Sequence, residues 1–121
     1  MFDHVGLNVR DYAASRAFYE RALAPLGYHV VMAVEEWKSA GLGTDEKPEL
    51  WLSQREPHGT GTHLAFACAD RESVDAFHEA ALAAGGTDNG APGVREHYHP
   101  TYYGAFVLDP DGNNVEAVCH V

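Results

Sequence analysis

The chain has 121 residues, of which 45% are hydrophobic and 21% charged, and its 18 acidic and 8 basic side chains give a formal charge of −10. This composition fits a globular fold large enough to bury a core, and the sequence contains neither a signal-peptide pattern nor the run of about 18 apolar residues that a membrane helix needs. The negative charge opposes binding to nucleic acids and to anionic membranes, so we expect a cytoplasmic protein that binds neither.

An internal repeat organises the sequence. Residues 4–27 align with residues 63–86 at a constant offset of 59, without a gap, and nine of the 24 aligned positions are identical. The identical pairs are His4/His63, Asp11/Asp70, Ala17/Ala76, Phe18/Phe77, Glu20/Glu79, Ala22/Ala81, Leu23/Leu82, Ala24/Ala83 and Gly27/Gly86. Alanine-rich helices would share Ala and Leu by chance, but not His, Asp, Phe and Gly in register. The repeat predicts one domain, residues 1–121, made of two modules at about 1–56 and 60–121.

Each module is predicted to form a strand, a helix and three more strands. The first strands, residues 4–9 and 63–68, alternate apolar and other side chains with a period of two. Asp11 and Asp70 stand where helix N-caps belong, and glycines follow both helices. The apolar stripes of the helices are predicted to be Ala14, Phe18, Ala22 and Leu23 in the first, and Val74, Phe77, Ala81 and Leu82 in the second. The later strands are predicted at 28–34, 37–42 and 50–53, then at 94–98, 103–108 and 114–118, with a type I turn at 109–112 before the last one.

The predicted fold is therefore α+β, with two βαβββ modules that curl a mixed sheet around a concave site and carry their helices on the outer face. Strand alternation puts His4, His63 and Glu116 on the face opposite the apolar side chains that contact the helices. Two imidazoles and one carboxylate are a ligand set for Zn, Fe(II), Mn or Ni. A metal would also compensate the cost of burying Glu116. The alternative is that both histidines are satisfied core residues and that Glu116 pairs with Arg10 or an amide.

Three segments carry a resemblance to a known family: DHVGLNV (3–9), THLAFAC (62–68) and YYGAFVLDPDGNNVEAV (102–118). With the twin modules, they resemble the vicinal oxygen chelate superfamily, which includes glyoxalase I, fosfomycin and bleomycin resistance proteins and extradiol dioxygenases. The resemblance implies a divalent metal on His4, His63 and Glu116 that chelates adjacent oxygens of a small substrate. It also implies a homodimer, in which the site can combine modules from one chain or from two.

The resemblance leaves a fourth ligand position open, in the segment PELWLSQ (48–54). Trp51 matches that position best, and Glu49 lies two residues away on the same strand face. Because glyoxalase I has an acidic residue there, this difference favours lyase-like or dioxygenase-like chemistry over glutathione-dependent isomerisation.

The segment 97–103 is rich in acid–base groups. His97 or His99 could move protons, and Tyr102 could donate a hydrogen bond to a metal-bound oxyanion, with Glu116 as the catalytic carboxylate. A surface loop with ordinary aromatic packing is the alternative for this segment. For the whole chain, the alternative function is a non-catalytic ligand-binding protein of the bleomycin-resistance type, for which the −10 charge would suit a cationic ligand.

Overall fold

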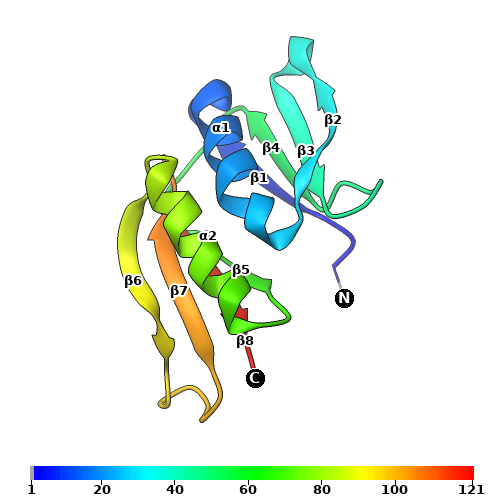
Figure 1. Ribbon diagram of the computed structural model, residues 1–121. Coiled ribbons are helices and arrows are strands. Elements are labelled where there is room, and N and C mark those ends of the chain that lie inside the picture. The colour runs from blue at the N-terminus through cyan, green and yellow to red at the C-terminus, as the bar shows by residue number, and fades with distance from the viewer. Residues whose placement is uncertain (1) are drawn as a thin grey trace.

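The computed structural model describes residues 2–121, which form two βαβββ modules (Figure 1). The first contains β1 (Val5–Val9), α1 (Tyr12–Leu23), the 3-10 helix η1 (Ala24–Leu26), β2 (His29–Val34), the 3-10 helix η2 (Glu35–Trp37), β3 (Ser39–Gly43) and β4 (Leu50–Gln54). The second contains β5 (His63–Ala67), α2 (Arg71–Ala83), β6 (Thr87–Val94), β7 (Tyr103–Leu108) and β8 (Asn114–Cys119). The predicted α+β fold is confirmed.

Each module forms its own four-stranded mixed sheet. The strand orders are β1-β4-β3-β2 and β5-β8-β7-β6, with the first pair parallel and the others antiparallel. The two orders are equivalent, as the sequence repeat predicts. Because β5 pairs with β8, residues from the start and the end of the second module become neighbours: His63 is opposite Asn114, and Ala65 is opposite Glu116.

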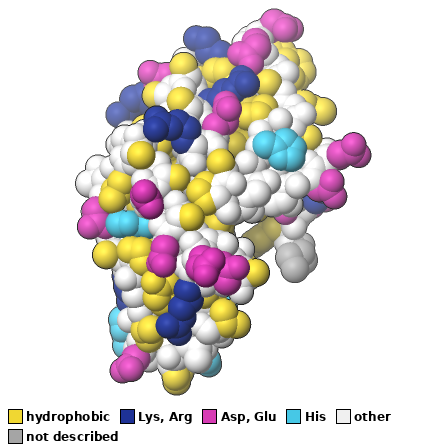
Figure 2. Space-filling model, viewed as in Figure 1, with side chains coloured by type: hydrophobic (Ala, Val, Ile, Leu, Met, Phe, Trp, Pro, Cys, Tyr) yellow, Lys and Arg dark blue, Asp and Glu magenta, His cyan; other side chains and the backbone are white. Residues whose placement is uncertain are grey.

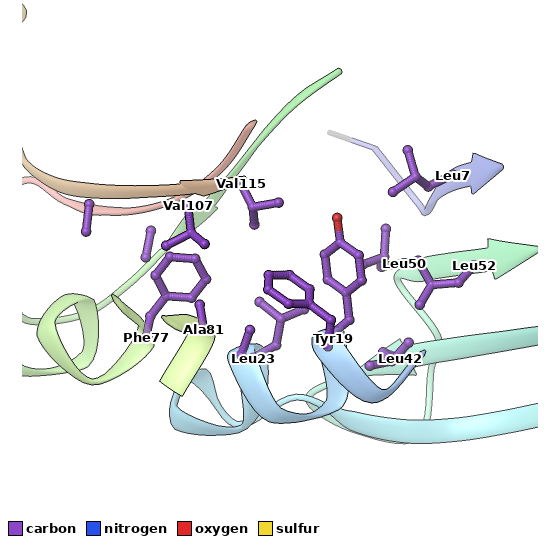
Figure 3. Packing of buried hydrophobic residues seen from close by; sticks show 14 of the residues in the cluster. Leu7, Tyr19, Leu23, Leu42, Leu50, Leu52, Phe77, Ala81, Val107 and Val115 are labelled. Atoms are coloured by element: carbon purple, nitrogen blue, oxygen red, sulfur yellow. The ribbon is translucent and has the colours of Figure 1, made fainter. Parts of the chain in front are cut away.

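The two helices lie side by side, and each packs on its own sheet (Figure 1). A single cluster of buried side chains contains members from both modules (Figure 3). Phe18 and Leu23 of α1 belong to it together with Phe77 of α2, and Val107 and Val115 add the second sheet. Full burial of each large apolar side chain contributes about 1.5–3 kcal/mol. The helix-packed faces of the sheets are thus committed to the core, and the opposite faces remain open for a site.

The turn before β8 links the modules through a buried carboxylate. Asp109 Oδ2 accepts a hydrogen bond from the Tyr19 hydroxyl at 2.6 Å, and Asp109 Oδ1 accepts from the backbone amides of Asp111 and Asn113. The Gly112 amide donates to the Asp109 carbonyl at 3.0 Å, which closes the predicted turn. The DPDGN segment therefore fixes the start of β8 against α1.

Both predicted N-caps are present. Asp11 accepts a hydrogen bond from the Ala14 amide and Asp70 from the Ser73 amide, each satisfying an amide that has no partner within its helix. The hydrogen bonds from Ser73 lower the pKa of Asp70 below its usual 3.8. Gly27 ends the first helical segment in the left-handed region, with φ of 86°.

Four details of the sequence prediction are wrong. The strand expected at 94–98 lies earlier, as β6 at Thr87–Val94. Gly90 and Gly93 have low strand propensity, but the hydrogen bonds from β7 make this segment a strand. Trp37 is in η2 and exposed, not in a strand. On the helices, Ala14 and Leu82 are exposed because the buried stripes run through other positions: Tyr12, Ser15, Phe18, Tyr19, Ala22 and Leu23 in α1, and Val74, Phe77 and Ala81 in α2.

Charge is unevenly divided between the modules. Residues 1–59 contain nine acidic and six basic side chains, a formal charge of −3, whereas residues 60–121 contain nine acidic and two basic ones, a charge of −7. On the face shown in Figure 2, most of the basic side chains lie over the first module. None of the helices within residues 2–121 is long and apolar enough to cross a membrane.

Candidate functional site

The site is built on the open face of the second sheet. Along β5, Leu64 and Phe66 pack against the core, whereas His63, Ala65 and Ala67 point away from the helices and are exposed. This is the alternation that the sequence predicted. The parallel pairing with β8 then sets the open face of β5 beside Asn114 and Glu116.

Glu116 is held by two protein donors. Its side chain is 1% exposed, its Oε1 lies 2.8 Å from His63 Nε2, and its Oε2 accepts a hydrogen bond from the Tyr102 hydroxyl. These two contacts, both within one chain, offset the free-energy cost of burying the carboxylate. The alternative partner Arg10 is elsewhere, where its backbone amide contacts Asp111.

Tyr102 reaches Glu116 because the neighbouring residue on β7 is a glycine. A Cβ at Gly104 would lie 3.2 Å from Glu116 Oε2 and 3.2 Å from the Tyr102 ring, closer than most Cβ contacts. Burial, and then the hydrogen bond to Glu116, raise the pKa of Tyr102 to about 12, while nearby Arg95 opposes this shift. The hydroxyl therefore keeps its proton at neutral pH and acts as a donor. Sequence reasoning overlooked Gly104, although a glycine inside a strand is a known sign of close approach.

His4 lies apart from this group. It precedes β1, its side chain is 56% exposed, and its Nδ1 is 2.8 Å from Asp3 Oδ1. It lines a cavity of about 190 Å³ with Tyr28, Glu49 and Phe66 among the other walls. Within residues 2–121, the structure places no group of three or more His, Cys, Asp or Glu side chains where they could hold a metal ion. Strand alternation places His4 and His63 on equivalent faces, but these faces belong to two different sheets.

The two candidates for the fourth ligand position lie in different surroundings. Glu49 lines the cavity that contains His4. Trp51 is in β4 and its ring lies against β3, where a Cβ at Gly41 would be 3.0 Å from it. Of the two candidates, Glu49 thus shares a cavity with His4, and Trp51 has a packing role.

The segment between β6 and β7 is a tight aromatic turn. The Arg95 amide donates to the Tyr102 carbonyl at 2.7 Å, and the rings of Tyr98 and Tyr102 meet edge to face at 5.0 Å. The rings of His97 and Tyr98 are in contact, with centroids 4.1 Å apart and planes tilted by 48°, whereas His99 Nδ1 accepts a hydrogen bond from the Thr101 amide. Of the predicted acid–base groups in this turn, Tyr102 touches Glu116.

The residues of one chain supply two adjacent donors of the kind that divalent metals bind. A neutral imidazole and a carboxylate that already converge suit Zn²⁺, Fe²⁺, Ni²⁺ or Mn²⁺. A third protein ligand would have to come from outside the group formed by His63, Glu116 and Tyr102.

The family model described as "Glyoxalase/Bleomycin resistance protein/Dioxygenase superfamily" matches residues 1–117. The chain belongs to this superfamily. A glyoxalase/bleomycin resistance protein from Albidiferax ferrireducens T118 has a similar structure, with a TM-score of 0.85, 31% identity and 98% of each chain covered. A family enzyme from Burkholderia phytofirmans PsJN is 25% identical, with 98% of each chain covered and a TM-score of 0.72. A glyoxalase/dioxygenase from Nostoc punctiforme, 23% identical, shares the fold at a TM-score of 0.72 over 100% of this chain and 91% of the other. A search of curated proteins found no match.

Proposed function

We propose that this superfamily member is a metal-dependent enzyme of the glyoxalase or dioxygenase type that acts on a small substrate with vicinal oxygens. The observation that carries the proposal is the contact between His63 and the buried Glu116. We infer that these two residues are metal ligands. A divalent metal bound there would supply Lewis acidity toward the substrate oxygens.

The third ligand, in this proposal, is the partner subunit's His4 in a homodimer. In a single chain His4 is largely exposed, and neither His63 nor Glu116 lines the cavity to which it belongs. A two-fold axis would bring the first module of each chain to the second module of the other and create two equivalent sites. The partner subunit's Glu49 would approach with it, since Glu49 and His4 line the same cavity.

Two residues are assigned to proton handling. Tyr102 keeps its proton and donates a hydrogen bond to Glu116. With a metal held by His63 and Glu116, its hydroxyl would be placed to donate to negative charge that develops on a substrate oxygen. His97 is a better proton shuttle than His99. His97 lines a surface hollow together with Phe106, whereas His99 Nδ1 is hydrogen-bonded to Thr101. Glu116 remains the catalytic carboxylate of the proposal.

The first test is the metal content of the purified, untagged protein by plasma mass spectrometry. We expect about one divalent ion per chain, lost in His63→Ala and in Glu116→Ala. The control is His29→Ala, which removes an exposed histidine of β2. Metal retained in both site variants would refute the proposal. The identity of the metal directs the assays, iron to oxygen uptake with catechol-like substrates, and zinc or nickel to lyase and isomerase reactions.

A mixing experiment tests the shared site. His4→Ala and His63→Ala chains should each bind no metal alone. If His4 acts across the dimer, re-assembled mixtures contain heterodimers with one intact site, which restores about a quarter of the wild-type metal content by random pairing. No restoration would refute the shared site.

The second candidate is a non-catalytic ligand-binding protein of the bleomycin-resistance type. Two observations favour it: the charge of −10, and the satisfaction of both Glu116 oxygens by protein donors. Calorimetric titration with bleomycin, a cationic glycopeptide, at two salt concentrations tests it. Binding that weakens with salt would support this candidate, and no heat at either concentration would exclude it.

The domain organisation is also a proposal. One buried cluster contains residues of both modules, so residues 1–121 should unfold as one domain rather than as separate modules 1–56 and 60–121. A single calorimetric transition whose van't Hoff and calorimetric enthalpies agree would support this. The cytoplasmic location stays a prediction.

A further inference from the structure

We propose that a hollow on the open face of the second sheet binds a small carboxylate with a flat apolar body, anchored by Arg95. This inference deepens the proposed function, on which it rests, by naming the chemical class of the substrate. The hollow has a volume of about 340 Å³, at the lower end of the range typical of small-molecule sites. It is lined by Asn89, Gly90, Arg95, His97, Tyr98, Phe106 and Asn114.

Arg95 has donors to spare. Its guanidinium lies over the Phe106 ring, 5.4 Å from the centroid, and its Nη2 donates to the Ala91 carbonyl at 2.7 Å. Within residues 2–121 it forms no ion pair with a carboxylate, whereas Arg16 pairs with Glu20 and Glu35. A guanidinium has five N–H groups in a fixed plane, so most of them remain for a ligand. The stacking on Phe106 holds that plane at the edge of the hollow.

Two glycines of β6 leave the space that the guanidinium occupies. A Cβ at Gly90 would lie 3.2 Å from Arg95 Nη2 and 2.9 Å from the Phe106 ring, and a Cβ at Gly93 would lie 3.1 Å from Arg95 Nη1. A side chain at either position would force the guanidinium to shift by a few tenths of an ångström. Gly90 and Gly93, which lower the strand propensity of β6, therefore leave the space in which the Arg95 guanidinium lies. Arg95 and Arg71 are the two Lys or Arg residues among the 11 charged side chains of residues 60–121.

The hollow lies beside the His63–Glu116 pair, because its lining residues Asn114 and Phe106 are in register with His63 and Glu116. Phe106 is in register with Glu116 on one side and with Gly90 on the other, so the three residues form one row across the sheet. The Phe106 and His63 rings are 6.3 Å apart. A flat molecule that fills the hollow past the edge of Phe106 would therefore place one end at Arg95 and the other toward His63 and Glu116.

The charges favour a monoanionic carboxylate over a phosphate. The second module has a formal charge of −7, and Arg95 is the single basic side chain that lines the hollow. One guanidinium fork matches one carboxylate through two parallel hydrogen bonds. In the metal-free protein, a dianion would bring a second negative charge toward Glu116 with no second Lys or Arg of the hollow to balance it. The side-chain amides of Asn89 and Asn114, which contact each other at 3.2 Å, add neutral polar contacts at the wall.

The test uses benzoate and its neutral isostere benzamide, with binding followed by ligand-observed NMR in EDTA so that no metal takes part. Wild-type protein should bind benzoate at least about tenfold more tightly than benzamide, because only the carboxylate forms charge-assisted hydrogen bonds. Arg95→Gln should weaken benzoate binding by a similar factor, and Arg95→Lys, which keeps the charge but loses the fork, should weaken it less.

The matched control is Arg71→Gln. Arg71 also stacks on an aromatic ring, 4.7 Å from the Tyr103 centroid, and its removal changes the net charge equally. Equal loss of benzoate binding in both glutamine variants would overturn the proposal, as would wild-type affinity in Arg95→Gln. If Arg95→Gln does not fold, as judged by circular dichroism, Arg95→Lys replaces it. The proposal is then overturned if Arg95→Lys binds benzoate as tightly as wild type and the wild-type protein does not prefer benzoate to benzamide.

Two measurements on the wild-type protein separate this proposal from the proposed function, because benzoate binding in EDTA and metal content are determined independently of each other. Benzoate binding through Arg95 in a chain that takes up no metal would refute the metal chemistry and keep the anion site. Metal uptake by a protein that does not bind benzoate would refute the anion site and keep the metal chemistry.

Discussion

Replacing Tyr102 by Phe tests how the buried carboxylate of Glu116 is satisfied. The substitution removes one oxygen and leaves the ring that packs edge to face on Tyr98. Glu116 would keep its contact with His63, but its Oε2 would lose the hydroxyl donor in a position that is 1% exposed. Little water can replace the donor there.

The expected cost follows from the type of bond that is lost. Hydrogen bonds to charged groups contribute about 1.5–3 kcal/mol, and a buried acceptor left without a partner lies at the upper end of that range. We therefore expect Tyr102→Phe to lower the free energy of unfolding by about 2–3 kcal/mol. In a Glu116→Gln background the same change breaks a neutral hydrogen bond, so its cost should fall to about 1 kcal/mol.

The assay is urea unfolding followed by circular dichroism, at one protein concentration and in EDTA, so that neither dimerisation nor a bound ion differs between variants. Tyr98→Phe is the matched control: it removes the same atom from an exposed ring of the same turn, and we expect a change within about 0.5 kcal/mol. A loss below about 0.5 kcal/mol in Tyr102→Phe, or an equal loss in the control, would refute this account of Glu116.

Three further predictions concern other parts of the fold. Gly86→Ala should cost about 1–3 kcal/mol in urea unfolding because its Cβ would lie 2.4 Å from Val107 Cγ1, whereas Gly59→Ala, with no atom within 4 Å, should be nearly neutral. Burial raises the pKa of Cys68 to about 11 from 9.0, so at pH 8 iodoacetamide should alkylate it about 100-fold more slowly in the native than in the unfolded protein, as mass spectrometry of the peptide would show. Hydrogen bonds from Ser73 lower the pKa of Asp70, so the ionised cap stabilises the fold above pH 3.8, and this stabilisation is lost as the pH falls through the lower folded-state pKa. The melting temperature should therefore drop more steeply with acid in wild type than in Asp70→Asn.

Much of the fold could be predicted from local patterns. The offset of 59 residues located both modules, and the alternation on β5 and β8 put His63 and Glu116 on the face opposite the core. The N-cap residues Asp11 and Asp70 fixed where the helices begin. These features depend on neighbours within a few residues, which a sequence displays directly.

Local patterns failed where pairing or packing outweighed propensity. β6 contains two glycines and a proline, and it is a strand because β7 supplies its hydrogen-bond partners. Alternation assigns a side chain to a face of its own strand, but it carries no information about the distance between faces of different sheets. For this reason the sequence grouped His4 with His63 and Glu116, and the structure of one chain does not.

The sequence alone determined the two-module fold and the open-face position of His63 and Glu116, because period-two alternation and a gapless repeat are properties of the chain itself. The superfamily followed from the resemblance of segments 3–9, 62–68 and 102–118, and the family model that matches residues 1–117 confirms it. Only the tertiary structure decided that Tyr102 shares Glu116 with His63 and that Arg95 lies over Phe106. Those contacts join residues on separate strands and turns, and their distances arise from strand register and from the space left by Gly90, Gly93 and Gly104.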